Sequence, residues 1–141
     1  MEKKTIMVLE DDPKIAIALA VRLEAAGFKV LSAPDGARGL KLALTHRPDL
    51  ILMDIWMPVG LGLSVAQRLR DLGFQNIPVI FITASRLKGL RAAAMKLGAV
   101  GYFEKPYDPE QLLAAIHDAL ERRTYTASSV PQSAPVSRMT A

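Results

Sequence analysis

Short apolar runs without polar interruption constrain the fold of this chain more than any other feature of its sequence. Residues 50–53 and 79–82 carry no polar side chain, and strands of this kind are buried on both faces. Such burial is typical of a parallel sheet, because its crossover connections place helices over each side. Strand-like runs and helical periodicity alternate five times between residues 5 and 120. The pattern therefore predicts an α/β fold, in which a five-stranded parallel sheet has helices on both faces.

The expected elements have recognisable boundaries. Strands are expected at residues 5–9, 28–32, 49–53, 78–82 and 100–103. Residues that favour helix N-termini open four of the expected helices, at Pro13, Asp35, Ser85 and Asp108. Lys29 and Ser32 interrupt the second strand, so an edge position suits it. Ser85 is expected to cap the fourth helix, which would end at Gly98.

The chain reads as one domain followed by a different kind of segment. Its 141 residues suit a single domain. Residues 124–141 are rich in Ser, Thr and Pro, and Arg138 is their only charge. Because so few apolar side chains are available to pack there, we expect a folded domain over residues 1–123 and a flexible tail or linker stub over residues 124–141.

Composition excludes several functional classes. The absence of cysteine excludes disulfides, thiolate catalysis and iron–sulfur clusters. No apolar run approaches the roughly 20 residues that span a bilayer, and residues 1–4 lead straight into a strand without a signal-peptide core. A cytoplasmic protein without membrane contact is expected. The net charge of +4 is scattered along the chain without interleaved aromatic residues, which does not favour direct nucleic-acid binding.

Polar side chains follow four of the expected strands at the point where each strand ends. They are Glu10, Asp11, Asp12, Asp54, Thr83 and Lys105. The carboxyl ends of parallel strands meet at one edge of a sheet, where ligands bind at the switch in strand order. If the strand order is 2-1-3-4-5, the first and third strands are neighbours, and their acids face each other across a crevice.

Converging carboxylates repel one another and therefore need a cation. Oxygen ligands without His or Cys favour Mg²⁺, and a carboxylate beside Mg²⁺ can attack a phosphoryl group. Thr83 and Lys105 would then neutralise charge on the transferred group. Asp12 directly precedes Pro13, so a helix cap accounts for it as well as a minor role at the metal.

Four short motifs carry a resemblance to a known family. They are residues 8–12 (Val-Leu-Glu-Asp-Asp), 53–58 (Met-Asp-Ile-Trp-Met-Pro), 82–84 (Ile-Thr-Ala) and 105–106 (Lys-Pro). Together with their spacing, these motifs resemble the receiver domain of bacterial two-component response regulators, in particular the chemotaxis-regulator type. The resemblance covers about residues 3–123, on the element pattern given above. It implies a flavodoxin-like (βα)₅ fold with strand order 2-1-3-4-5, and a receiver domain over residues 1–123.

The resemblance also implies roles for the residues at the strand ends. Asp54 would be the phosphoacceptor. Asp11 would bind Mg²⁺ directly and Glu10 through water, and the backbone carbonyl of Trp56 would complete the metal shell together with Asp54. Thr83 would donate a hydrogen bond to the phosphoryl group.

The remaining implied roles concern the switch and its partners. Lys105 would contact the phosphoryl group ionically and would precede Pro106 in a cis peptide bond. Tyr102 would swing as Thr83 moves, and so change the surface of the fourth helix, fifth strand and fifth helix. The donor would be a sensor histidine kinase or a phosphotransfer protein, and the output a downstream protein. Such a switch catalyses its own phosphorylation and slow dephosphorylation, without turnover of an outside substrate.

Two alternatives remain open from the sequence. One is a Mg²⁺-dependent phosphatase with Asp54 as nucleophile, although Trp56 stands where such enzymes usually place a general acid. The other is a pseudo-receiver that binds partners without phosphorylation. The chain also departs from the family pattern, because Leu61-Gly62 stands where Asp-Gly is usual. The bulky Trp56 is expected to shield an acyl phosphate from water.

Overall fold

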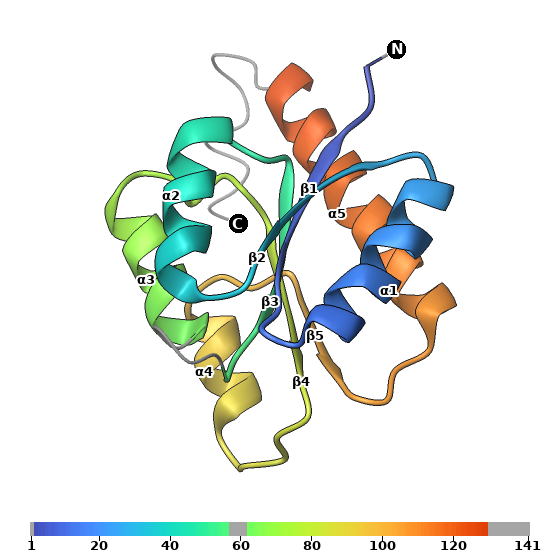
Figure 1. Ribbon diagram of the computed structural model, residues 1–141. Coiled ribbons are helices and arrows are strands. Elements are labelled where there is room, and N and C mark those ends of the chain that lie inside the picture. The colour runs from blue at the N-terminus through green and yellow to red at the C-terminus, as the bar shows by residue number, and fades with distance from the viewer. Residues whose placement is uncertain (1, 57–61, 130–141) are drawn as a thin grey trace.

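A five-stranded parallel sheet forms the centre of the molecule. The computed structural model describes residues 2–56 and 62–129, with side chains through residue 122. The strands are β1 (Thr5–Leu9), β2 (Lys29–Ala33), β3 (Leu50–Asp54), β4 (Val79–Thr83) and β5 (Gly101–Glu104). Their order is β2-β1-β3-β4-β5, and every pair is parallel (Figure 1). The fold and strand order expected from the sequence are confirmed, and the interrupted second strand lies at an edge.

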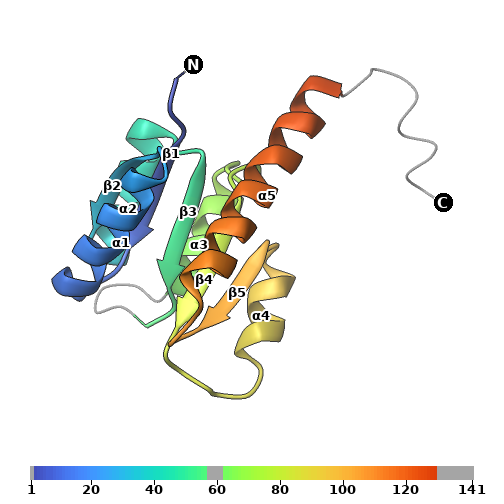
Figure 2. The same ribbon diagram turned by 90° about the vertical axis from the view of Figure 1, so that its right-hand side faces the viewer.

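Helices cover both faces of this sheet. They are α1 (Pro13–Ala25), α2 (Gly36–His46), α3 (Gly62–Asp71), α4 (Leu90–Lys96) and α5 (Pro109–Ser129). Figures 1 and 2 show α1 and α5 on one side of the sheet and α2 and α3 on the other. The α4 helix joins the side of α2 and α3, because its buried Ala94 belongs to the same apolar cluster as Val65 and Leu69 of α3.

Alternation along each strand divides the core into two layers. Ile6 and Val8 of β1 pack with the inner faces of α1 and α5, whereas Met7 and Leu9 pack on the side of α2, α3 and α4. All four are 1% exposed or less. Successive side chains of a strand point to opposite faces, so a strand that is buried on both sides must be apolar throughout. This requirement is the physical reason for the uninterrupted apolar runs.

Three of the expected helix starts are capped by aspartates. The side chains of Asp12, Asp35 and Asp108 each accept a backbone N–H at the start of α1, α2 and α5, with distances of 2.8–2.9 Å. Pro13 occupies the first turn of α1, where a missing N–H costs nothing. These caps fix where the chain turns from the end of a strand into the following helix.

The start of α4 differs from the sequence expectation. Ser85 does not cap the helix: its Oγ accepts the N–H of Leu87 at 3.2 Å, which closes a separate turn. The helix begins at Leu90, after Gly89 with φ 89°. A residue in this left-handed conformation cannot lie inside a right-handed helix, so a helix that started at Ser85 would be broken there. The segment after Thr83 is therefore a loop, residues 84–89.

The last helix also extends further than expected. It runs through residues 124–129, which the sequence analysis assigned to the tail. These residues contain neither Gly nor Pro, and the next Pro is Pro131, so nothing in their backbone stops a helix. Residues 57–61 and 130–141 lie outside the described part of the chain, and with them Met57, Pro58 and Leu61 of the expected motif and the rest of the expected tail.

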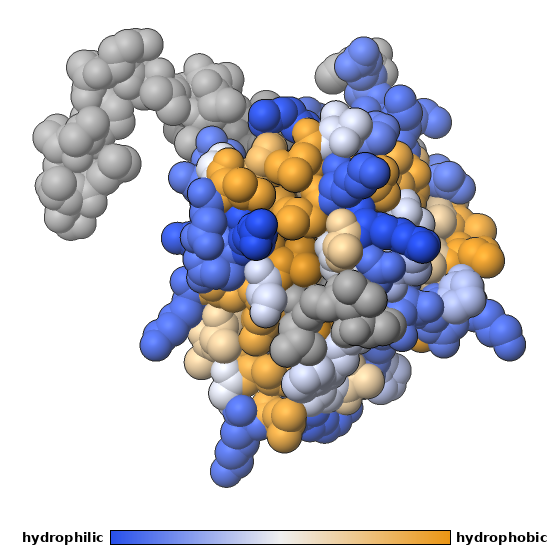
Figure 3. Space-filling model, turned by 60° about the vertical axis from the view of Figure 1, so that its left-hand side comes forward, coloured by the Kyte–Doolittle hydropathy of each residue, from blue (hydrophilic) through white to orange (hydrophobic). Residues whose placement is uncertain are grey.

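The outer faces of the helices are largely polar. Figure 3 shows hydrophilic side chains projecting around the face that α2 and α3 cover, with hydrophobic surface between them. Apolar exceptions lie on α1, α2 and α4, where Ile17, Val21, Leu44 and Met95 are each at least 42% exposed. Within residues 2–56 and 62–129, no helix has both the length and the apolar character that crossing a bilayer requires.

Replacement of Gly62 tests a close approach between α3 and β3. A Cβ at Gly62 would lie 2.3 Å from the backbone oxygen of Asp54 and 3.0 Å from the Cα of Ile55, and backbone atoms cannot rotate away. We expect Gly62→Ala to lower the free energy of unfolding by about 2 kcal/mol or more, measured by urea denaturation.

The matched control is Gly101→Ala in β5. There an added Cβ would meet the side chain of Ile80 at 3.2 Å, and a side chain can shift. We expect a loss of about 1 kcal/mol or less. Equal losses in the two variants would contradict the close approach at Gly62.

Candidate functional site

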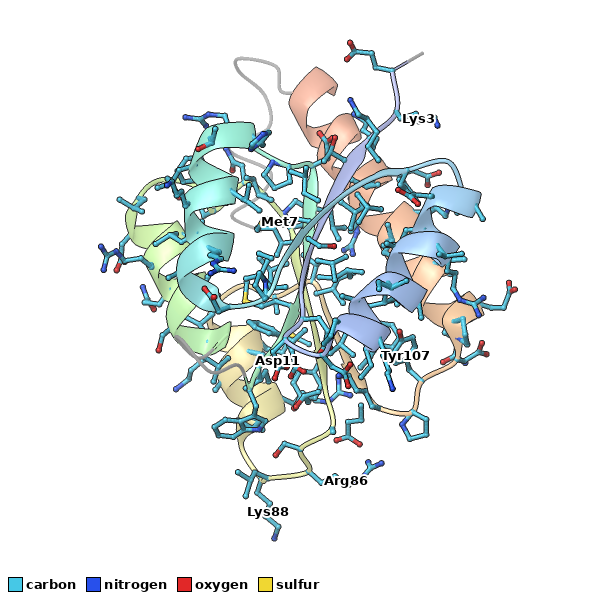
Figure 4. All side chains as sticks on the ribbon, viewed as in Figure 1. Lys3, Met7, Asp11, Arg86, Lys88 and Tyr107 are labelled. Carbon is cyan, nitrogen blue, oxygen red and sulfur yellow. The ribbon has the colours of Figure 1, made fainter. Side chains whose placement is uncertain are left out.

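The register of the sheet brings the acids together. Leu9 of β1 pairs with Met53 of β3, so the next residue of each strand, Glu10 and Asp54, stands at the same level. Oxygen atoms of Glu10, Asp11 and Asp54 all lie within 4.8 Å of one another. Figure 4 shows Asp11 at the end of β1, among polar side chains at the carboxyl edge of the sheet. The three residues that the sequence analysis assigned to a metal therefore form one cluster.

Burial differs among the three acids. Glu10 is 6% exposed and Asp54 is 8% exposed, while Asp11 is exposed to solvent. Charged carboxylates are rarely buried unless a partner compensates them. The cluster therefore combines two enclosed acids with one that remains open to an incoming ligand.

Lys105 provides the compensating charge. Its Nζ lies 2.9 Å from Glu10 Oε1 and 3.2 Å from Asp54 Oδ2, so one ammonium group bridges both buried acids. The backbone N–H of Lys105 donates to the carbonyl of Thr83 at 2.8 Å, one residue beyond β5. The peptide bond between Lys105 and Pro106 is cis, as the resemblance implies.

The electrostatic balance of the pair is visible in its pKa shifts. Burial raises the pKa of Glu10 above the ordinary value, and the hydrogen bond from Lys105 opposes this shift without cancelling it. Burial alone would lower the pKa of Lys105, but the hydrogen bond to Glu10 and the charge of Asp54 outweigh it, so the pKa of the lysine is raised. Lys105 is therefore held as a cation, and its charge compensates only part of the cost of burying ionised Glu10.

Two hydrogen bonds fix the carboxylate of Asp54. Its Oδ1 accepts the backbone N–H of Trp56 at 3.1 Å, and its Oδ2 accepts from Lys105. The N–H of Gly62 donates to the carbonyl of Ile55 at 2.8 Å, which ties the start of α3 to the residue after Asp54. The orientation of the Asp54 side chain is thus set by the backbone N–H of Trp56 and by the ammonium group of Lys105.

Thr83 lies at the end of β4, fully buried. Ile82 pairs with Asp54 across β3 and β4, so Thr83 stands one residue beyond the level of the acid. Its Oγ1 accepts the N–H of Ser85 at 3.0 Å. A hydroxyl has one donor and two acceptor positions, so this bond leaves the hydroxyl hydrogen of Thr83 available to another acceptor.

Tyr102 and Asp12 do not belong to the acid cluster. Tyr102 is 7% exposed and belongs to the core on the side of α4, where the Arg91 guanidinium lies 4.8 Å from its ring centre. Burial raises the pKa of the Tyr102 phenol. Asp12 caps α1 with its side chain, and its backbone N–H donates to Glu10 Oε2 at 3.2 Å.

Sequence reasoning missed one contact at the edge of the site. Arg86 forms an ion pair with Glu104 through Nη1 and donates from Nη2 to the carbonyl of Lys105 at 3.2 Å. No sequence pattern predicted a contact between these two charged residues. They are 18 positions apart, on segments that meet only when β4 and β5 pair, so no local pattern could have indicated the contact.

Comparisons with known proteins identify the family of this chain. The model of the family "Response regulator receiver domain" matches residues 6–117. Among solved structures, a CheY-like response regulator receiver domain protein from Methanospirillum hungatei superposes with a TM-score of 0.83 and 25% identity, over 87% of this chain and 98% of that one.

Curated relatives match over nearly the whole chain. The transcriptional regulator RpaA of Synechocystis is 39% identical over 130 residues, which cover 92% of this chain and 52% of that protein. The regulatory protein PrrA of Mycobacterium tuberculosis is 37% identical over 124 residues, or 88% and 53%. The chain thus spans about half the length of these relatives. Its fold, its acid cluster and these matches together show that the chain belongs to the response regulator receiver domains of bacterial two-component systems.

Proposed function

We propose that this receiver domain is a phosphoacceptor switch in which Asp54 accepts the phosphoryl group. The observation that carries this proposal is the enclosed Asp54 carboxylate, which lies within hydrogen-bond distance of Lys105 and in one oxygen cluster with Glu10 and Asp11. A carboxylate in this setting has both a fixed orientation and a neighbouring cation. These are the two requirements for attack on a phosphoryl group, whose transfer depends mainly on positioning and charge neutralisation.

The reaction of the switch is a transfer between two covalent carriers. A carboxylate oxygen of Asp54 attacks the phosphorus of a phosphohistidine on a sensor histidine kinase or phosphotransfer protein. The P–N bond breaks, its electron pair stays on the imidazole nitrogen, and that nitrogen then takes up a proton. Lys105 would neutralise one oxygen of the transferred group, and the hydroxyl hydrogen of Thr83 would bond another. Hydrolysis later returns Asp54 and inorganic phosphate.

The oxygen cluster fits a hard divalent cation. Mg²⁺ is usually held by one or two carboxylates together with several waters, and oxygens of the three acids lie within 4.8 Å of one another. We assign the site to Mg²⁺ held by Asp11, Asp54 and the Trp56 carbonyl, with Glu10 contributing through water. The ion would supply positive charge to the phosphoryl oxygens.

The output of the switch would pass through Thr83 and Tyr102 to the α4–β5–α5 surface. Thr83 and Tyr102 lie on the adjacent strands β4 and β5, and the loop after Thr83 leads directly into α4. Movement of Thr83 toward a phosphoryl group would therefore pull on this loop and change the space around Tyr102. The surface would then be recognised by a downstream protein. The receiver unit would extend through α5, with any flexible tail after it.

The alternatives have less support. A phosphatase needs a general acid near the leaving group. Trp56 occupies that position and donates its backbone N–H to Asp54, but its side chain is not an acid. A pseudo-receiver has no use for a cluster of acids whose burial is costly, as the raised pKa of Glu10 indicates. A switch that turns over no outside substrate explains both features.

Acetyl phosphate with Mg²⁺ tests the proposal directly. We expect intact mass to increase by one phosphoryl group, and the fluorescence of Trp56, the single tryptophan of the chain, to change. Asp54→Asn should abolish both signals, whereas Asp35→Asn, which keeps a good helix cap, should leave them unchanged. An adduct that survives Asp54→Asn, or rapid multiple turnover of a small phosphate ester, would refute the phosphoacceptor role.

Trp56 is expected to slow the loss of the phosphoryl group. The backbone N–H of Trp56 donates to the Asp54 carboxylate, and the residue is 43% exposed. Its side chain is therefore available to cover an acyl phosphate on Asp54. We expect Trp56→Ala to speed hydrolysis by about threefold or more, equivalent to ~0.65 kcal/mol in the barrier, measured by the decay of radiolabelled phosphoprotein. Leu87→Ala, which removes an exposed apolar side chain from a neighbouring loop, is the control. An unchanged or slower decay in Trp56→Ala would count against shielding.

The raised pKa of Glu10 predicts a pH-dependent stability in EDTA. A group with a raised folded pKa contributes stability below its unfolded value, which is 4.5, and this contribution is lost as the pH rises through the folded pKa. We therefore expect Glu10→Gln to be more stable than the parent at pH 7, with a smaller difference at pH 4, in urea denaturation. Glu121→Gln, at an exposed acid of α5, should show no such trend. A Glu10→Gln variant that is less stable at pH 7 would overturn the interpretation.

A further inference from the structure

We propose that Arg86 is a positioning residue for the phosphoryl site. From the loop of residues 84–89 its guanidinium binds the Glu104 carboxylate and the carbonyl of Lys105. These two contacts, the Arg86 clasp, join the loop after Thr83 to the turn that carries Lys105. Figure 4 shows Arg86 and Lys88 on this loop, with Lys88 projecting away from the body of the protein.

The clasp lies at the end of the paired part of β4 and β5. Thr83 pairs with Glu104 at the end of the register between β4 and β5, and the N–H of Lys105 makes a further bond to the Thr83 carbonyl. Beyond this point, Ser85 and its neighbours turn toward α4, while Pro106 leads toward α5. Arg86 bridges the diverging segments, and its planar fork suits two acceptors at once.

The clasp is also connected to the backbone of both proposed phosphoryl contacts, Lys105 and Thr83. Lys105 accepts the clasp on its carbonyl, while its Nζ lies against Glu10 and Asp54. On the other strand, the N–H of Ser85, directly before Arg86, holds Thr83 Oγ1. A change in the clasp therefore shifts the backbones from which the ammonium and the hydroxyl both project.

The ion pair of the clasp is too exposed to contribute much to the free energy of unfolding. The side chains of Arg86 and Glu104 are 62% and 41% exposed, and exposed ion pairs contribute only about 0–1 kcal/mol and are screened by salt. Loss of the clasp should therefore leave global unfolding nearly unchanged. Its effect should be confined to the order of the loop and the turn, and it should disappear at high ionic strength.

Amide hydrogen exchange in EDTA tests the clasp without phosphorylation. We expect Arg86→Ala to speed exchange of the Lys105 and Ser85 amides by about threefold or more at low salt, which is within the range for an exposed pair, and to match the parent in 1 M NaCl. Lys88→Ala removes the same charge from the same loop and should leave these amides unchanged. Equal exchange in the parent and Arg86→Ala, or equal acceleration in Lys88→Ala, would overturn the proposal.

Affinity for beryllium fluoride with Mg²⁺ gives the functional readout. This part of the inference rests on the proposed function. We expect Arg86→Ala and Glu104→Gln each to weaken binding by about threefold, equivalent to ~0.65 kcal/mol. The double variant should be no weaker than Arg86→Ala, and Arg86→Lys should restore part of the loss.

The two proposals fail in different ways. Undiminished affinity in Arg86→Ala, or additive losses in the double variant, would refute positioning by the clasp. If the parent itself binds no beryllium fluoride, the phosphoacceptor proposal fails, while faster exchange of the Lys105 amide in Arg86→Ala would still establish the contact.

Discussion

One ammonium group between two buried carboxylates governs the arrangement of this receiver domain. The Nζ of Lys105 reaches Glu10 from β1 and Asp54 from β3, although it follows β5 at the far edge of the sheet. It can span this distance only because the strands are parallel and end at one edge. Strand register, burial of the acids and the charge of the lysine are therefore parts of a single constraint, and the chemistry of the site depends on all three.

Much of the fold follows from the sequence because burial on both sides leaves a strong pattern. The apolar runs indicated the parallel sheet, and Asp12, Asp35 and Asp108 indicated helix starts that the structure confirms. The predicted start of α4 at Ser85 was wrong, because the left-handed backbone at Gly89 overrides the capping preference of Ser85. Local preference identifies where a helix is able to begin, whereas the path of the chain decides where it does begin.

The candidate site was predictable to the extent that its residues end strands. Glu10, Asp11 and Asp54 could be placed together because the expected strand order makes the first and third strands neighbours, and parallel strands end at one edge of the sheet. The contact between Arg86 and Glu104 could not, because both side chains are flexible and meet across loops that the sequence leaves undefined. Contacts between polar residues at strand ends can thus be predicted from the sequence more easily than contacts between the charged side chains of the surrounding loops.

The packing around Tyr102 connects a buried ring to a charged side chain at the surface. The cation of Arg91 rests on the buried ring, and its Nη2 lies 3.5 Å from the tyrosine carbonyl. A reoriented Tyr102 ring would no longer lie beneath the guanidinium of Arg91, which is exposed at the start of α4. Repacking of the core there would move a positive charge on the exterior of the domain, where a protein partner could contact it.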